Sequence, residues 1–383
     1  MDLKKKRIYL SSPTINGYEM SYIKEAFDTN WVAPLGKNVN EFEHEMASYI
    51  GVEDAAALSS GTAAIHLAVK LAGIHRGDVV FSSALTFAAT CNPVVYEGGT
   101  LVFIDSEKDT WNMSPEALEE GFKKYPYAKA VILAHLYGTP AKVDQIMEIC
   151  DRYGAILIED AAEALGSRYK GKNCGAFGTY GILSFNGNKI ITTSGGGMLL
   201  SDNKKAIEKA RFWATQSREP VRHYEHKEIG YNYRMSNIVA GIGRGQLLTL
   251  DEYKKKKKRI YYHYQKAFHD ISDIHMNPIN PDGESNHWLS CAILDPKLVQ
   301  QGITPELIIE ELEKENIESR PIWKPMNLQP IYSKNDFIQI DSSNNFSIGE
   351  DIFMHGICLP SDIKNTDEDR QKIIDIIRKV YFK

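Results

Sequence analysis

The segment SFNGNKIITTSGGG, from Ser184 to Gly197, is the part of the sequence around which the rest can be arranged. It predicts a short strand, a polar turn that presents Lys189, and a glycine-lined exit into a second strand at Met198–Ser201. A partly desolvated lysine amine loses its proton more easily and can condense with an aldehyde, so Lys189 is a candidate nucleophile. Taken alone, the pattern also fits a solvated lysine in a turn, with glycines that serve the backbone conformation.

A carboxylate upstream of this segment favours the first interpretation. Asp160 follows Glu159 and the buried-looking run Ala155–Ile158, and the pattern predicts a strand with acidic side chains at its end. An aspartate beside a pyridinium nitrogen keeps that nitrogen protonated, and the ring then withdraws electrons from a bound substrate. Asp160 also fits a simple helix N-cap for the segment Ala161–Leu165, so both interpretations stay open at this point.

The chain around these residues alternates between short apolar runs and helical stretches. A parallel sheet wrapped by helices produces this alternation, and such sheets bind ligands at the carboxyl ends of their strands. The sequence therefore predicts an α/β protein with a mostly parallel sheet. The expected strands are Ala55–Leu58, Val79–Phe81, Leu101–Ile104, Ala130–Leu133 and Ala155–Ile158. The expected helices include Gly17–Asp28, Val39–Ile50, Thr62–Leu71, Pro115–Lys124 and Val143–Tyr153.

Two further strand ends carry candidate ligand-binding residues. Ser59-Ser60-Gly61-Thr62 joins a strand to a helix N-terminus, where free N–H groups and the helix dipole favour a phosphate. An ordinary N-cap explains the same residues. Phe87 follows the next strand and could stack on a planar cofactor or belong to the core. Neither a GxGxxG nor a GxxxxGK[ST] motif occurs, so a dinucleotide or P-loop site has no support.

The length of 383 residues favours two domains. From about residue 250 the regular alternation is lost, so we expect a large domain over residues 15–249 and a small α+β domain over residues 250–383. Residues 1–14 are expected to pack on the small domain. A strand at Leu289–Leu294 and amphipathic helices at Pro305–Glu315 and Asp367–Tyr381 are predicted there. The basic run Lys254–Arg259 fits a solvated helix face better than an RNA contact.

Composition excludes several classes of function. The net charge of −5 gives no general attraction to nucleic acid or to an anionic membrane. The five cysteines form no CxxC pair, so we expect no metal site and no disulfide framework. The basic segment Met1–Arg7 is not followed by an apolar region, and no apolar run is long enough to span a membrane, so a cytoplasmic location is expected.

These pieces together fit the chemistry of pyridoxal 5′-phosphate (PLP), with Lys189 on its aldehyde and Asp160 on its ring nitrogen. The chain also resembles the PLP-dependent nucleotide-sugar aminotransferases of the DegT/DnrJ/EryC1/StrS family, which have the aspartate-aminotransferase-like (type I) fold. The resemblance runs along nearly the whole sequence. Its matching blocks are Asn30–Gly36, Ser60–Ala64, Glu159–Ala164, Gly230–Asn237, Arg320–Pro325 and Gly356–Ser361.

The resemblance implies a role for each matching residue. It makes Lys189 the lysine that bonds to PLP and moves the proton, and Asp160 the partner of the ring nitrogen. Phosphate contacts are implied for Gly61, Thr62 and Ser184, and Phe87 would lie on one ring face. Glu163 takes the place near the ring hydroxyl where many members carry Gln. Asn232 is similar to a residue that reaches the cofactor of the neighbouring subunit, which implies a homodimer with shared active sites.

The resemblance also narrows the substrate. The segment Asn186–Gly197 and the stretch Thr215–His226 look like the versions in enzymes that aminate the C4 ketone of UDP-4-keto-6-deoxy-N-acetylglucosamine, the bacillosamine type. L-glutamate would be the amino donor, in two half-reactions that share Lys189. Asn327 replaces a His that is common in the family, and Trp323 fits either substrate binding or packing. The residues expected to contact the nucleotide-sugar are Asn30, Trp31, Val32, Ala33, Asn186 and Arg320.

Three alternatives remain. An aminotransferase of the same family could act on a GDP-4-keto sugar or on a dTDP-linked 3-keto or 4-keto-6-deoxysugar. A sugar dehydratase of this fold would carry His in place of Lys189, which the chain does not. A non-catalytic regulator or binding protein on the same fold would be expected to have lost Lys189 or Asp160, and both are present.

Overall fold

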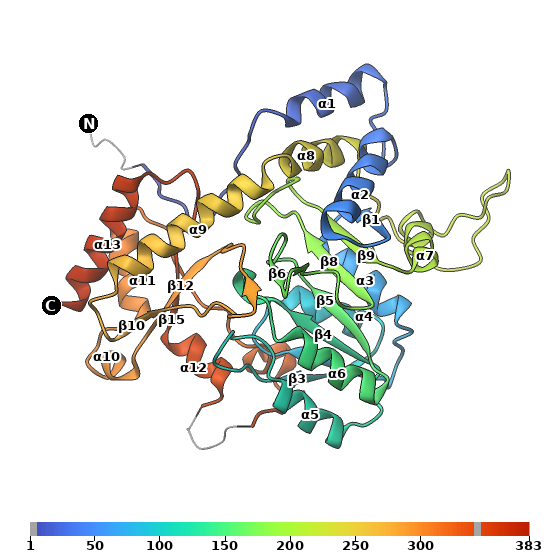
Figure 1. Ribbon diagram of the computed structural model, residues 1–383. Coiled ribbons are helices and arrows are strands. Elements are labelled where there is room, and N and C mark those ends of the chain that lie inside the picture. The colour runs from blue at the N-terminus through green and yellow to red at the C-terminus, as the bar shows by residue number, and fades with distance from the viewer. Residues whose placement is uncertain (1–5, 341–345, 383) are drawn as a thin grey trace.

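The structure, a computed structural model, describes residues 6–340 and 346–382 (Figure 1). Within these residues, eight strands form one large sheet. β9 runs antiparallel to both of its neighbours, and every other pair in the sheet is parallel, which confirms the predicted mostly parallel sheet. The spatial order is β1 (Asp54–Leu58), β9 (Gly197–Ser201), β8 (Tyr180–Ser184), β5 (Ile156–Asp160), β4 (Ala130–Ala134), β2 (Val79–Ser83), β3 (Thr100–Ile104) and β14 (Asp336–Ile338).

The sheet is buried on both faces, which explains why its strands are short, continuous apolar runs. Val80 and Phe81, neighbours on β2, belong to hydrophobic clusters on opposite faces. One cluster joins the sheet to α3 (Gly61–Leu71), α4 (Asn92–Tyr96) and α7 (Lys204–Ala214). The other joins it to α5 (Pro115–Lys124) and α6 (Val143–Tyr153). The predicted helices over α3, α5 and α6 are confirmed, and α4 and α7 were not predicted.

A three-helix layer made of α1 (Glu19–Asp28), α2 (Lys37–Ile50) and α8 (Asn237–Leu247) covers the β1 end of the sheet. α8 was not predicted, because its glycines are poor helix formers. The structure shows why they are there. A Cβ on Gly243 would lie 2.5 Å from the ring of Phe42, and one on Gly245 would lie 2.7 Å from Cα of Glu19. The glycines therefore let α1 and α2 approach the backbone of α8 closely.

A second, antiparallel sheet lies in the C-terminal part of the chain, at the far end of the long helix α9 (Leu250–Ala267) in Figure 1. Its strands are β10 (Ile274–Met276), β12 (Ser290–Leu294), β15 (Gly356–Leu359) and β13 (Arg320–Pro321). A separate hydrophobic cluster joins it to α9, α11 (Pro305–Lys314) and α13 (Asp367–Tyr381). The remaining elements here are α10 (Pro296–Gln300), α12 (Ile348–His355) and the short helices η3 (Met326–Leu328) and η4 (Pro330–Tyr332).

Some segments depart from a simple division at residue 250. β14 lies in the C-terminal third of the sequence but pairs in parallel with β3 of the large sheet. β11 (Gly283–Glu284) pairs with β6 (Arg168–Tyr169), which in turn pairs with β7 (Lys172–Asn173). Near the N-terminus, Ile8 pairs with Ile317 and belongs to the hydrophobic cluster of the antiparallel sheet. The first five residues of the predicted N-terminal arm lie outside the described residues. The domain boundary itself stays a prediction.

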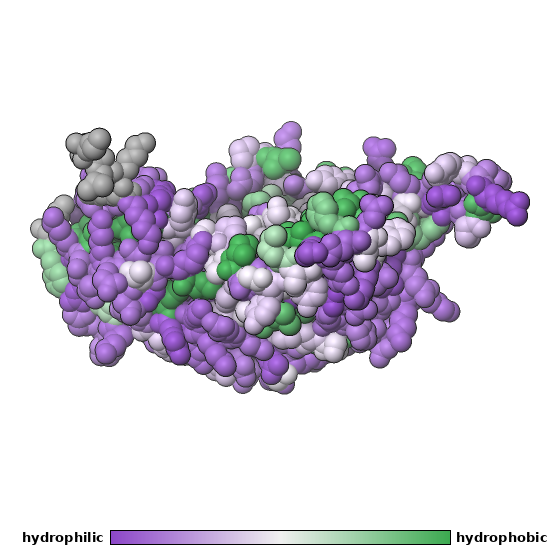
Figure 2. All heavy atoms as spheres, turned by 90° about the horizontal axis from the view of Figure 1, so that it is seen from above, coloured by the Kyte–Doolittle hydropathy of each residue, from purple (hydrophilic) through white to green (hydrophobic). Residues whose placement is uncertain are grey.

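The face that carries α1, α8 and α9 has an uneven surface. Figure 2 shows apolar side chains gathered across its middle, with hydrophilic side chains on both flanks. Large apolar side chains on α1 and in the loop after it are widely exposed, among them Met20 at 63%, Phe27 at 60% and Leu35 at 53%. None of the described helices is both long enough and apolar enough to pass through a bilayer.

Candidate active site

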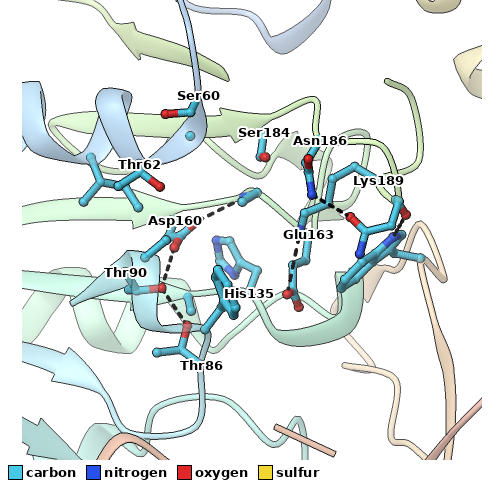
Figure 3. Close-up of a pocket in the computed structure, with 18 of the residues that line it drawn as sticks. Ser60, Thr62, Thr86, Thr90, His135, Asp160, Glu163, Ser184, Asn186 and Lys189 are labelled. Atoms are coloured by element: carbon cyan, nitrogen blue, oxygen red, sulfur yellow. Dashed lines mark hydrogen bonds and ion pairs between the residues drawn. The ribbon is translucent and has the colours of Figure 1, made fainter. Parts of the chain in front are cut away.

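A cavity of about 300 Å³ opens at the carboxyl ends of β5 and β8 (Figure 3). The parallel arrangement of the strands brings these ends to one edge of the sheet, and the N-terminus of α3 closes one side. The cavity is lined by eight of the residues predicted for the site: Gly61, Thr62, Phe87, Asp160, Glu163, Ser184, Asn186 and Lys189.

Lys189 is presented by the tight loop that follows β8. Backbone hydrogen bonds from Phe185 N to Gly196 O (2.9 Å) and from Thr193 N to Phe185 O (2.9 Å) close this loop. The side chain of Lys189 is largely buried, with 13% exposed. Its Nζ lies 3.5 Å from Glu163 Oε1 and 4.0 Å from the centre of the Trp288 ring. The amine therefore projects into the cavity between a carboxylate and an aromatic face, and not into solvent.

Asp160 is the last residue of β5 and is buried. Thr90 Oγ1 donates a hydrogen bond of 2.7 Å to Asp160 Oδ2, and the Ala162 amide donates one of 3.1 Å to Oδ1. Thr86 Oγ1 lies 2.7 Å from Thr90 Oγ1 and completes the chain of hydroxyls seen in Figure 3. Thr90 lies in the short helix η1 (Ala88–Thr90). Both carboxylate oxygens are thus oriented, and the Asp160 charge is held at a fixed place in the cavity.

The N-terminus of α3 provides hydrogen-bond donors at the other end of the cavity. Ser60 caps the helix by accepting from the Ala63 amide at 3.0 Å. Among the described residues, no acceptor pairs with the amides of Gly61 and Thr62, as expected in the first turn of a helix. A Cβ on Gly61 would lie 3.1 Å from Cβ of Ser184. The helix end and Ser184 therefore form a narrow cradle suited to an anion such as a phosphate.

Glu163 and Phe87 flank the cavity. The Glu163 carboxylate accepts from the Tyr137 amide at 2.8 Å. Burial raises the pKa of Glu163 above its ordinary value, and the charge of Lys189 offsets part of this rise. The Phe87 ring is 54% exposed and its centre lies 5.4 Å from that of Trp323. Phe87 is thus an aromatic surface open to a planar ligand, and its role there stays a proposal.

Three groups of predicted residues do not line this cavity within one chain. Asn232 is exposed in the segment after α7, where its backbone pairs with that of Thr215. Arg320 is mostly exposed and pairs with Glu318 at 2.8 Å, in an adjoining depression on the second sheet. The third group is the loop Asn30–Ala33, which lies against the start of α8. Asn232 was expected to reach the cofactor of the neighbouring subunit and not that of its own chain, and the predicted roles of all three groups stay predictions.

Asn237 holds the loop Asn30–Ala33 in its place. The Asn237 side-chain amide donates to Trp31 O at 3.0 Å, and its backbone N–H donates to Ala33 O at 2.8 Å. The Trp31 side chain remains 50% exposed. The backbone of this loop is therefore held in place while its side chains are exposed to solvent. Such an arrangement is suited to binding another molecule.

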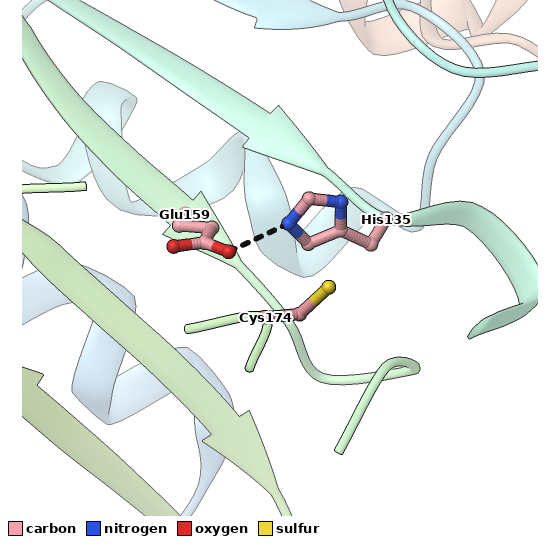
Figure 4. A group of neighbouring side chains, drawn as sticks. All are labelled: His135, Glu159 and Cys174. Carbon is pink, nitrogen blue, oxygen red and sulfur yellow. Dashed lines mark hydrogen bonds and ion pairs between the residues drawn. The ribbon is translucent and has the colours of Figure 1, made fainter. Parts of the chain in front are cut away.

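Glu159, the residue before Asp160, belongs to a buried cluster with His135 and Cys174 (Figure 4). His135 Nε2 lies 2.8 Å from Glu159 Oε1, and His135 Nδ1 accepts from the Ala141 amide at 3.1 Å. Burial works against the charge of Glu159, but hydrogen bonds from His135 and from backbone amides outweigh it and lower the pKa of Glu159. Because both the ring nitrogens and the carboxylate already have protein partners, we interpret the cluster as a support beneath β5, and assign it no metal.

Two contact residues of the site were not predicted from sequence. Thr90 and Trp288 contact the groups that the sequence did identify, Asp160 and Lys189. Neither carries a motif, since a threonine and a tryptophan at these places fit ordinary packing equally well. Asn327, the departure from the family pattern, does not line the cavity. Its Oδ1 is buried without a hydrogen-bond partner among the described residues, and its Nδ2 lies 3.5 Å from Glu350 Oε1.

Comparison with known proteins agrees with this geometry. The profile of the DegT/DnrJ/EryC1/StrS aminotransferase family matches residues 13–378. EpsN of Bacillus subtilis (strain 168), named provisionally as a pyridoxal phosphate-dependent aminotransferase, is 50% identical over 380 residues, which cover 98% of this chain and 96% of EpsN. The GDP-perosamine synthase of Caulobacter vibrioides is 34% identical over 375 residues, and the match covers 98% of each chain.

Solved structures show the same likeness. The DegT DnrJ EryC1 StrS aminotransferase from Brucella abortus superposes with a TM-score of 0.86 at 27% identity, covering 96% of both chains. Spr1654 from Streptococcus pneumoniae, described provisionally as a sugar aminotransferase and solved in a PLP-form, gives a TM-score of 0.88 at 25% identity and covers 98% of both chains.

The fold and the site thus define a PLP-dependent enzyme of the type I fold. The chain belongs to the DegT/DnrJ/EryC1/StrS aminotransferase family and is a PLP-dependent sugar aminotransferase. The residues present fit the cofactor, because a lysine amine, a fixed carboxylate and a free helix N-terminus face one cavity. Bound there, PLP supplies an aldehyde for the amine and a protonated ring that withdraws electrons.

Proposed function

We propose that the protein transfers the amino group of L-glutamate to the C4 ketone of a UDP-linked 4-keto-6-deoxy-N-acetylhexosamine. The product, a UDP-4-amino sugar, would serve the synthesis of a surface glycan or exopolysaccharide in the cytoplasm. The observation that carries the chemistry is that Lys189, Asp160 and the free N-terminus of α3 line one cavity. The choice of sugar rests on the resemblance of the segments Asn186–Gly197 and Thr215–His226 to enzymes of the bacillosamine type.

Each residue has a defined task in this proposal. Lys189 Nζ would accept the proton taken from the substrate carbon and return it to the cofactor carbon on the other side of the linking nitrogen, as a general base and then a general acid. The Asp160 carboxylate keeps the proton on the ring nitrogen, and Thr90 keeps Asp160 oriented. The amides of Gly61 and Thr62, with Ser184, hold the phosphate. The buried walls limit the access of water to Lys189.

A GDP-linked 4-keto-6-deoxyhexose is the second candidate substrate. The observation in its favour is the match to GDP-perosamine synthases from three bacteria, at 32% to 34% identity over nearly the whole chain. The cavity residues do not discriminate between the two nucleotides, because none of the groups that line it is specific for a base.

We also propose that the protein acts as a homodimer with shared active sites. The exposed loop Asn30–Ala33 and the exposed Asn232 support this, since they match family positions that reach a bound substrate or cofactor but lie outside the cavity of their own chain. The segment after α7 also extends away from the body of the molecule in Figure 1. The apolar middle of the face in Figure 2 offers a surface that a second copy could cover.

The visible absorbance spectrum of the protein saturated with PLP tests the proposal. We expect a band from the lysine-bound cofactor that disappears with L-glutamate and returns with the UDP-linked ketosugar. Lys189→Ala should show neither response. Faster recovery with a GDP-linked 4-keto-6-deoxyhexose would replace the first substrate by the second. A band that ignores L-glutamate would overturn the proposed donor, and no band after incubation with PLP would overturn the proposed role of Lys189.

A further inference from the structure

The C-terminal part of the chain contributes one segment, Asn286–Trp288, directly to the wall of the cavity. Asn286 Nδ2 donates to the backbone oxygens of Glu163 at 2.9 Å and of Leu165 at 3.0 Å, and Ser167 Oγ accepts from the Asn286 amide at 2.9 Å. Asn286 Oδ1 in turn accepts from the Trp288 amide at 2.8 Å. The backbone of Trp288 is therefore fixed against the same segment that carries Glu163.

Trp288 contacts the side chain of Lys189 and the backbone of the residue before it. Its ring centre lies 4.0 Å from Lys189 Nζ, and its Nε1 donates a hydrogen bond of 2.7 Å to the carbonyl oxygen of Asn188, the preceding residue. The indole is 1% exposed and stacks on Tyr137, with ring centres 6.2 Å apart and planes inclined by 25°. A side chain this constrained has one position available, so it defines where the amine of Lys189 rests.

Two carboxylates near Lys189 Nζ favour a positive charge at this place. Glu163 Oε1 lies 3.5 Å from Nζ, and Asp160 lines the same cavity from the end of β5. An indole face attracts a cation, and the attraction grows when the cation is removed from water. We propose that Trp288, contributed by the C-terminal part of the chain, is a positioning residue that holds the amine of Lys189 in the cavity when it is not bonded to the cofactor, and holds it most strongly once the amine has accepted a proton.

The proposal rests on the proposed role of Lys189 and extends it. A lysine that has accepted a proton must stay within reach of the carbon to which it returns that proton, and geometric error is costly in such steps. Two further contacts keep Trp288 and the Lys189 loop in register. Lys257 Nζ donates to Trp288 O at 3.0 Å, and Ser11 Oγ donates to Asn188 O at 2.9 Å. The position of the Lys189 amine therefore depends, through Trp288, on the position of the second sheet.

A double-mutant cycle on the full-length chain without added PLP tests this contact. The free energy of unfolding is measured in denaturant for Trp288→Leu alone, Lys189→Met alone and the two together. If the ring holds the ammonium, Trp288→Leu should reduce the folding equilibrium constant about tenfold more when Lys189 is present than in the Lys189→Met background. Trp288→Phe, which keeps a ring, should restore most of that coupling. A tryptophan needed only for packing would cost the same in both backgrounds.

Trp323 provides the matched control. It lines the same cavity and lies beside Tyr137, with ring centres 6.3 Å apart, but its ring is not among the described aromatic contacts of Lys189. Trp323→Leu in the same two backgrounds should show no coupling. Equal coupling for both tryptophans, or none for Trp288, would overturn the inference.

A second measurement covers the case in which Trp288→Leu does not fold. An ammonium close to an indole alters its fluorescence, so Lys189→Met should change the emission of the wild-type chain and should have no such effect in Trp288→Phe. Unchanged emission in the wild-type background would also overturn the inference. Coupling between Trp288 and Lys189 without a PLP band would support the contact and reject the proposed function. A PLP band without coupling would support the proposed function and reject the contact.

Discussion

The residues predicted for the site lie in two regions that differ in how complete they are within one chain. In the cavity, Lys189, Asp160 and the N-terminus of α3 are enclosed, and their partners come from the same chain. The loop Asn30–Ala33 and Asn232 are exposed, and their side chains face no part of that cavity. Both sets of residues match the family pattern, yet only the first forms a site on its own.

The difference separates two kinds of functional residue. A strand end in a parallel sheet is positioned by the fold of one chain, because the sheet itself brings the ends together. A loop such as Asn30–Ala33 is positioned only in its backbone, by Asn237, and keeps a half-exposed tryptophan. The first kind can be assigned from a single chain. In the proposed homodimer, the second kind acquires its function from a second copy.

Asp160→Asn should have the largest effect on the chemistry of the enclosed region. The amide keeps the shape of the side chain but removes the charge that balances the protonated ring, and the loss of a buried ionic partner corresponds to about a 10²- to 10³-fold slower reaction with L-glutamate. Stopped-flow absorbance measures this half-reaction directly. Asp270→Asn, at an exposed carboxylate paired with Arg378, is the control and should react at the wild-type rate. A change of less than threefold in Asp160→Asn would contradict the assignment of Asp160.

Mixing two inactive variants tests whether the exposed region completes the site of a second copy. Lys189→Ala should be inactive, and Asn232→Asp should be strongly impaired because, in the proposed homodimer, it would place a carboxylate near the phosphate of the neighbouring site. In mixed dimers with shared sites, one site carries both defects and the other carries none. Random exchange should then restore about a quarter of the wild-type sites.

The two variants are unfolded together, refolded and assayed for sugar amination, and each variant refolded alone is the control. Failure to regain activity, in a preparation shown to contain mixed dimers, would place Asn232 outside the neighbouring site. Activity regained by variants that stay monomeric would show that the exposed region does not need a second copy.

Thr90→Val should have a smaller effect within the enclosed region. It removes one hydrogen bond to a charged acceptor, whose loss typically slows a dependent step about tenfold, while the Ala162 amide still orients Asp160. Thr86→Val is the matched control, because Thr86 contacts Asp160 only through Thr90 and should cost less. The rate of the L-glutamate half-reaction is the measurement. An effect of Thr86→Val that equals or exceeds that of Thr90→Val would show that the hydroxyl chain is not what orients Asp160.

The fold could be predicted from sequence where a single apolar pattern decides an element. The helix predicted at Asp367–Tyr381 has those bounds in the structure, and the strand predicted at Leu101–Ile104 is one residue longer. The prediction fails where contacts with residues far away in the sequence determine whether an element forms. β14 has only Phe337 and Ile338 as apolar residues and forms because β3 offers a free edge, and α8 is helical although its glycines disfavour a helix.

The candidate site follows the same division. Asp160 could be predicted because it ends an apolar run, where a parallel sheet places ligands, and Lys189 because it lies in the polar turn that follows the strand ending at Ser184. Trp288 could not, since it is about a hundred residues away in sequence and reaches Lys189 through contacts of Asn286 with the segment after β5. Thr90 likewise becomes meaningful only when η1 is seen beside the end of β5. Sequence therefore identifies the groups that do chemistry better than those that hold them in place.

Lys257→Met should have the smallest effect on activity, but it should change how the free energy of unfolding depends on pH. The variant tests the packing of α9 behind Trp288. Lys257 is buried on α9, where Nζ donates to Ser361 O at 2.7 Å and to Trp288 O at 3.0 Å. Burial lowers the pKa of Lys257 from 10.5 to about 8, although the charge of Asp362 opposes this shift. Between pH 8 and pH 10.5 the unfolded chain therefore binds this proton more tightly than the folded chain.

The contribution of Lys257 to the free energy of unfolding should accordingly rise with pH across this window, by about 3 kcal/mol in total. The difference between wild type and Lys257→Met, measured by denaturant unfolding at a series of pH values, isolates that slope because all other titrating groups are shared. Lys256→Met, at a partly exposed lysine of the same helix that pairs with Glu252, is the control and should show no comparable slope. A difference that is independent of pH would mean that Lys257 titrates alike in both states, so that the contact between α9 and Trp288 O admits water and the enclosed region is open on that side.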